Sequence, residues 1–185
     1  MLEELYDFAK HPVYILDKNN NLQYRFRKLI KLLVISLCLS ILLLMIASTL
    51  QHVFQLEMGK HAIDDLFKDN SAIVIFILAV IVAPFLEELL FRGPLLFFKN
   101  SKYFPTVFYS FTLIFGLIHL SNFELSTEVW LLSPLLVAPQ IGIGFLLGFI
   151  RVKFGLVWSM TMHALYNLIL IFPLVILKLL DIEIE

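Results

Sequence analysis

Apolar residues fill five long stretches of this chain, and short polar segments separate them. The stretches cover about 29–50, 72–98, 103–119, 129–150 and 154–177. An α-helix needs roughly 20 apolar residues to cross the hydrocarbon core of a bilayer. Inside that core, helices and closed barrels alone satisfy their own backbone hydrogen bonds. The pattern therefore predicts an all-α, polytopic membrane bundle of about five transmembrane helices.

Composition supports a membrane protein and excludes other classes. Of the 185 residues, 60% are hydrophobic and 16% are charged, whereas about 25% are charged in soluble domains. A chain of this size cannot hide so much apolar surface in its own core, so the excess is expected to face the lipid bilayer. A net charge of -1 excludes a strongly basic nucleic-acid-binding protein, and the single Cys38 excludes an internal disulfide framework.

The distribution of charge predicts two regions and an orientation. Residues 1–28 form a polar segment, and residues 29–185 form a single transmembrane domain. Lysine and arginine gather in 1–28 and in the links after the second and fourth apolar stretches, while the alternate links carry fewer, Lys60 and Lys68 among them. Because positive charge collects on the cytoplasmic side, we expect a multi-pass protein with its N-terminus in the cytoplasm and its C-terminus outside.

Proline and glycine interrupt two of the apolar stretches. Pro84 lies in the second, and Pro134 and Pro139 are expected to break the fourth. The backbone groups that such residues free must be satisfied by a neighbouring helix or a watery cavity. We therefore expect the helices to pack around an interior site. Three glycines of the fourth stretch predict close helix contacts: Gly142, Gly144 and Gly148.

Few ionisable residues lie well inside the apolar stretches. Apart from Lys31, they are Glu87, Glu88, Arg92, His119 and His163. Each would cost several kcal/mol if it faced lipid, so each is expected to face the interior of the bundle. A spacing of four residues places Glu88 and Arg92 on one helix face, and it does the same for His163 and Asn167.

These residue types suit more than one function. Adjacent carboxylates, two imidazoles and an amide inside a membrane can activate water and stabilise an oxyanion, as peptide hydrolysis requires. The same residue types serve in the proton or ion relays of transporters, although no inverted repeat is visible here. In a third interpretation, they brace helix contacts in a non-catalytic membrane binding protein.

Three motifs on separate stretches narrow the choice. They are EELLFR at 87–92, FGLIH at 115–119 and HALYN at 163–167. In that order, EExxxR, FxxxH and HxxxN resemble the CPBP family of intramembrane proteases, which includes the type II CAAX prenyl endopeptidases and the Abi or bacteriocin-immunity group. The resemblance covers about 72–170. It implies an endopeptidase that cuts a membrane-associated peptide, of the C-terminally lipidated CAAX type in part of the family. The alternative is a non-catalytic immunity protein.

The resemblance also implies roles for individual residues. By matching position, Glu87 is the general base that takes a proton from water, and His119 shares or orients that water. His163 and Asn167 point at the scissile carbonyl and stabilise the negative charge that develops there. Burial in a low-dielectric cavity suits Glu87 to its role, because it favours a carboxylate able to accept a proton near neutral pH.

Two questions concern the surroundings of these catalytic candidates. Glu88 and Arg92 are expected to form an ion pair that fixes the second helix and neutralises one of the two carboxylates. A divalent metal, with Zn as the candidate, would use Glu87, His119 and His163 as ligands. The helical zinc-protease signature HExxH is absent. The need for a metal stays open, and the glutamate and histidine mechanism is preferred.

Helix geometry predicts the depth of the site. At about 1.5 Å per residue, Glu87 and His163 lie roughly 15 to 18 Å from the cytoplasmic ends of their helices, and His119 lies near 24 Å. The three can meet if the helices tilt, and a site at this depth is expected to open toward the cytoplasm. Phe115 and Tyr166 are expected to be core aromatics.

Overall fold

The computed structural model describes residues 1–56, 59, 61–180 and 182. The described part is helical and contains no strand, apart from an isolated antiparallel bridge between His61 and Phe123. In chain order the elements are α1 (Leu2–Lys10), α2 (Leu22–Phe54), α3 (Ala62–Asp69), α4 (Ala72–Phe76), η1 (Ile77–Val82), α5 (Ala83–Phe91), η2 (Pro94–Phe98), α6 (Phe104–Ile118), η3 (His119–Asn122), α7 (Thr127–Phe154) and α8 (Leu156–Leu179).

Five of the described helical segments are long and apolar enough to cross a membrane, which confirms the predicted all-α polytopic bundle. Three of them begin at a polar cap: the side chains of Asn21, Ser71 and Ser126 each accept a hydrogen bond from a backbone N–H of the first turn. The Asn21 cap starts α2 well before the apolar pattern does. Lys60, one of the charges that predict the orientation, lies outside the described residues.

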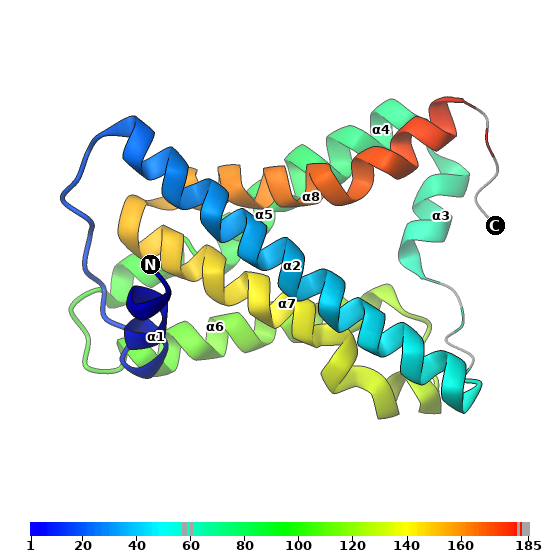
Figure 1. The fold of residues 1–185 in the computed structure, drawn as a ribbon, viewed down its shortest axis with the longest axis horizontal. Helices are drawn as coiled ribbons and strands as arrows, with labels where there is room; N and C mark the ends of the chain where they lie inside the picture. The colour runs from blue at the N-terminus through cyan, green and yellow to red at the C-terminus, as the bar shows by residue number, and fades with distance from the viewer. Residues whose placement is uncertain (57–58, 60, 181, 183–185) are drawn as a thin grey trace.

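The helices form two groups that meet at one end of the molecule (Figure 1). α7 packs against α2, α6 and α8, while α8 also packs along α4 and α5. The two groups spread apart toward the opposite end, where α3 lies (Figure 1). α7 is therefore the central helix, and its second half is mostly buried.

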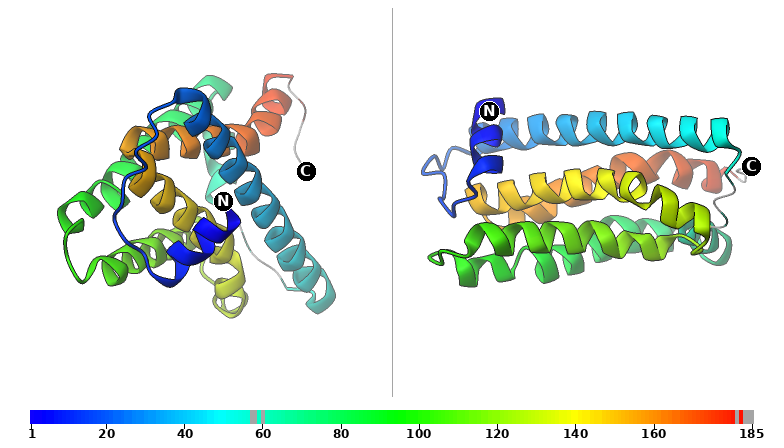
Figure 2. Two further views of the ribbon diagram at one scale, coloured as in Figure 1. Left: turned by 60° about the vertical axis from the view of Figure 1, so that its left-hand side comes forward. Right: turned by 90° about the horizontal axis from the view of Figure 1, so that it is seen from below.

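The N-terminal segment contributes to the core. α1 lies across the end of the bundle (Figure 2), and its Leu5 and Phe8 side chains are buried. The Phe8 ring packs edge-on against Phe108 and Phe149, with centroid distances of 5.1 and 5.2 Å. Residues 1–28 are thus more than a polar tail, because α1 carries an apolar face that the bundle buries.

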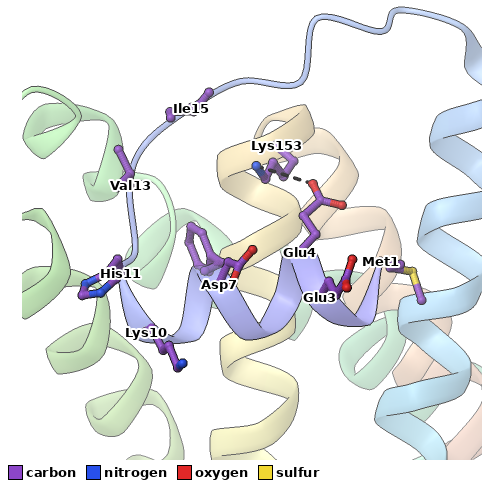
Figure 3. Close-up of a pocket in the computed structure, with 10 residues that line it drawn as sticks. Met1, Glu3, Glu4, Asp7, Lys10, His11, Val13, Ile15 and Lys153 are labelled. Atoms are coloured by element: carbon purple, nitrogen blue, oxygen red, sulfur yellow. Dashed lines mark ion pairs between the residues drawn. The ribbon is translucent and has the colours of Figure 1, made fainter.

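Ion pairs hold α1 to neighbouring helices. Glu4 lies 3.5 Å from Lys153 at the end of α7 (Figure 3) and 2.9 Å from Lys28 in α2. A pocket of about 610 Å³ lies beside α1 (Figure 3), and its lining comes from residues 1–15 and Lys153. This pocket is separate from the motif residues.

The expected break at Pro134 and Pro139 is wrong, because α7 runs without interruption from Thr127 to Phe154. Each proline removes one intrahelical hydrogen bond, and in a membrane helix packed neighbours and local adjustments compensate for this loss. The predicted close contacts of the glycines are confirmed. A Cβ atom on Gly144 would lie 2.9 Å from Phe115 Cδ1, and one on Gly148 would lie 2.5 Å from Phe108 Cε2.

Candidate active site

The acidic pair of α5 meets the histidine of α8 in the interior of the bundle. His163 Nδ1 lies 3.1 Å from Glu88 Oε1, and His163 Nε2 lies 3.8 Å from Glu87 Oε2. Glu88 is completely buried, whereas about 30% of the Glu87 side chain is exposed. The imidazole of His163 therefore lies between the buried carboxylate of Glu88 and the partly exposed carboxylate of Glu87.

Glu88 and Arg92 form the ion pair that their spacing predicts. Arg92 Nη1 lies 3.2 Å from Glu88 Oε1, and both side chains are buried. Arg92 Nη2 donates a hydrogen bond to the Gly144 carbonyl at 3.2 Å, and the guanidinium lies 3.9 Å from the centre of the Phe115 ring. Since the cation is held from three sides, it fixes the carboxylate that contacts His163.

Phe115 and its carbonyl orient the histidine of α6. The Phe115 ring packs edge-on against His119 and His163, at centroid distances of 4.9 and 5.9 Å, which confirms its place in the core. His119 Nδ1 lies 2.7 Å from the Phe115 carbonyl oxygen. A carbonyl oxygen can only accept, so Nδ1 carries the proton and neutral His119 keeps the lone pair of Nε2.

A pocket of about 300 Å³ brings Glu87 and His119 together. Glu87 Oε2 is buried and accepts no hydrogen bond from the described residues. The rest of the pocket wall comes from α5, α6 and η3: Leu86, Leu90, Phe91, Ile118, Ser121 and Asn122. Within the described part of the chain, that lining includes neither His163 nor Asn167.

The pocket extends toward the end of the molecule that carries α3. Ser121 and Asn122 also line a second pocket of about 380 Å³, together with His61 and Asp65. This end lies away from the lysine-rich links, whereas helix depth predicts an opening on the side of those links. The difference arises because η3 follows His119 immediately, so that residues of this turn, rather than the lysine-rich links, border the space beside Glu87.

Other polar residues of α8 complete the surroundings of the site. Asn167 Nδ2 donates to the Ala79 carbonyl in η1 at 2.8 Å. The buried Ser159 hydroxyl donates to Glu88 Oε2 and lies 2.9 Å from the Leu147 carbonyl oxygen. Sequence reasoning missed Ser159, although its position four residues before His163 was a usable signal. Tyr166 is a core aromatic, as expected.

The ligand set considered for a metal was Glu87, His119 and His163. Among the residues that the structure describes, no group of three or more His, Cys, Asp or Glu side chains is placed to hold a metal ion. Metal binding by these three residues stays a prediction.

Comparison with known families identifies the family of the chain. A family model described as type II CAAX prenyl endopeptidase Rce1-like matches residues 69–169, which is more than half of the chain and includes all three motifs. The chain belongs to this Rce1-like family. No curated protein and no solved structure matches it. Membership and the five apolar helices make this Rce1-like protein an integral membrane protein of a CAAX-type protease family.

Proposed function

We propose that this protein is an intramembrane endopeptidase in which Glu87 activates the attacking water. One observation carries the proposal: a buried oxygen of Glu87, which accepts no hydrogen bond from the described residues, borders a pocket that also contains His119. A general base needs an acceptor atom within reach of water and substrate. Family membership supports the peptide bond as the target.

The proposed reaction uses protein side chains for each proton transfer. Water in the pocket donates a hydrogen bond to His119 Nε2 and gives a proton to Glu87, while its oxygen attacks the scissile carbonyl. The proton held by Glu87 then passes to the nitrogen of the leaving amine as the peptide bond breaks. The products are a carboxylic acid and an amine, so atoms and charges balance.

His163 is proposed to stabilise the oxyanion of the tetrahedral intermediate. Its Nδ1 is oriented by Glu88, and its Nε2 lies on the Glu87 side. When protonated, Nε2 can donate a hydrogen bond, and one well-placed donor contributes about 3 kcal/mol to such a step. Asn167 was predicted to share this role. One of its two amide N–H groups is bonded to Ala79, which leaves the other for the oxyanion.

The proposed substrate is a membrane-associated peptide, with the lipidated CAAX tail as the candidate that the family suggests. Leu86, Leu90 and Ile118 line the pocket and are exposed on the outer surface of the bundle. An apolar peptide or lipid chain can lie against them while the scissile bond reaches Glu87. We also propose that the N-terminus lies in the cytoplasm and the C-terminus outside, as the distribution of lysine and arginine predicts.

Purified protein in liposomes tests the proposal. The probes are a farnesylated CAAX peptide and the same peptide without the lipid, and products are identified by mass spectrometry. Wild-type protein is expected to cleave the lipidated peptide, and Glu87→Gln is expected to lose 100-fold or more of the rate, because general bases contribute about 10² to 10⁴. Glu3→Gln, which removes an exposed carboxylate of α1, is the matched control. Equal rates for wild type and Glu87→Gln would refute the proposal.

A further inference from the structure

The second transmembrane span is not a continuous α-helix. Its middle part, η1, is π-helical, and the Ala83 N–H bonds to the Leu78 carbonyl five residues before it. Such turns are rare and occur frequently at functional sites. One extra residue in a turn rotates everything after it by about 100°. η1 therefore decides which face of α5 carries Glu87 and Glu88.

The π register leaves one carbonyl without a backbone donor. Because Ala83 pairs with Leu78, the same register would pair the Ala79 carbonyl with the N–H of residue 84. Residue 84 is proline, which has no N–H. The donor that reaches the Ala79 carbonyl is instead Nδ2 of Asn167, at 2.8 Å. The amide of α8 thus takes the place of the N–H that Pro84 lacks.

This contact belongs to a row of polar contacts along one face of α8. Ser159, His163 and Asn167 are spaced by four residues and so lie on that face. Ser159 and His163 contact Glu88, and Asn167 contacts Ala79. The row runs along the second span from Glu88 in α5 back to Ala79 in η1, so Asn167 contacts the π-helical turn that precedes the carboxylates.

We infer that Asn167 is a positioning residue: its amide satisfies the Ala79 carbonyl, holds η1 in the π register, and thereby keeps Glu87 turned toward His163 and the pocket. The effect of Asn167 on catalysis rests on the proposed function. Its hydrogen bond to the Ala79 carbonyl, in place of the N–H that Pro84 lacks, does not depend on that function. Asn167 acts on the reaction through the backbone of η1, in addition to any contact that its second N–H makes.

A rescue experiment tests the inference through stability. Pro84→Ala restores an N–H at position 84, which can serve the Ala79 carbonyl when Asn167 is gone. Melting temperatures in detergent micelles are compared for wild type, Asn167→Ala, Pro84→Ala and the double variant. We expect Asn167→Ala to melt several degrees lower and the double variant to recover most of that loss. Asn167→Leu, which removes the amide donor but keeps a similar size, is expected to lose stability as Asn167→Ala does and to be rescued likewise.

Losses in melting temperature that simply add in the double variant would overturn the inference. Cleavage rates supply the second readout. A shift of about 1 Å in a catalytic group such as Glu87 lowers the reaction rate about 100-fold. We expect kcat to fall for Asn167→Ala with little change in KM, and to recover in part in the double variant, which restores the position of Glu87 but not the second N–H of Asn167. A double variant that regains stability while kcat stays as low as in Asn167→Ala would overturn the positioning role. If the wild-type protein cleaves no peptide, the proposed function fails, and the melting temperatures still decide the inference.

Discussion

The ion pair between Glu88 and Arg92 holds the carboxylate that contacts His163. The substitution Arg92→Met tests how much this pair stabilises the protein. Both side chains are buried, at 0% and 2% exposure, and their charged atoms are 3.2 Å apart. Removing the guanidinium leaves a carboxylate inside the bundle with the hydroxyl of Ser159 and the ring of His163 as its remaining partners. The loss of one partner of such a buried pair costs about 3 to 5 kcal/mol.

That cost corresponds to a loss of roughly two to four powers of ten in the folding equilibrium constant. Unfolding of the purified protein in mixed micelles, followed by circular dichroism, measures it. Lys31→Met is the matched control, because Lys31 is an exposed cation near the start of α2, and exposed substitutions of this kind change stability by about 0.5 kcal/mol or less.

The double variant Glu88→Gln with Arg92→Met makes the test specific. Replacing both charges by neutral groups of similar size removes the penalty of an unpaired buried ion. We expect the double variant to be more stable than Arg92→Met alone, with part of the loss remaining because an amide in place of the Glu88 carboxylate changes the contacts to His163. Unfolding of Arg92→Met like that of Lys31→Met would refute this role of the ion pair, and so would a double variant that loses the sum of both single effects.

Three further substitutions test separate parts of the account. Gly144→Ala forces a Cβ to 2.9 Å from the Phe115 ring and should cost about 1 to 3 kcal/mol of stability; an unchanged unfolding curve would contradict the close packing. Gly155→Ala should cost about 1 to 3 kcal/mol for a different reason, since this residue has φ +102° with open space around it; full stability would show that the turn tolerates a side chain. Burial raises the pKa of Asp17, but hydrogen bonds from a backbone N–H, a tyrosine hydroxyl and Lys28 outweigh it and hold the pKa below 3.8. The stabilisation from this carboxylate is full above pH 3.8 and is lost as the pH falls through the lower folded value, so Asp17→Asn should reduce the acid sensitivity of the melting temperature; an identical pH profile would contradict this.

The parts of the fold that sequence predicts are those set by local physics. A long apolar stretch has few alternatives to a helix in a bilayer, so five spans followed from the pattern. The pair of Glu88 and Arg92 followed from a spacing of four residues on one helix. The burial of Glu88 and His163 followed from the cost of placing such groups in lipid.

The parts that sequence does not predict depend on contacts between distant segments. In the π register of η1, the Ala79 carbonyl accepts a hydrogen bond from the Asn167 amide on α8. No local sequence pattern predicts this contact. Arg151 is another case: its Nε donates to the Arg92 carbonyl at 3.0 Å and its Nη1 to the Tyr14 hydroxyl at 3.0 Å, so that the N-terminal segment is linked to the end of α5. The direction of the pocket depends on η3, whose residues Ser121 and Asn122 form part of its wall. Counting residues along each helix separately does not predict where that turn lies.

The peptides that accumulate in membranes test the central claim most directly, namely that carboxylates and imidazoles from three spans form one hydrolytic site. Membranes that contain the wild-type protein are compared by mass spectrometry with membranes that contain Glu87→Gln, His119→Ala or the control Glu3→Gln, at equal protein levels. We expect cleavage products with wild type and Glu3→Gln, and their loss in both site variants. Identical peptide profiles for wild type and Glu87→Gln would contradict it and would favour a non-catalytic role such as immunity.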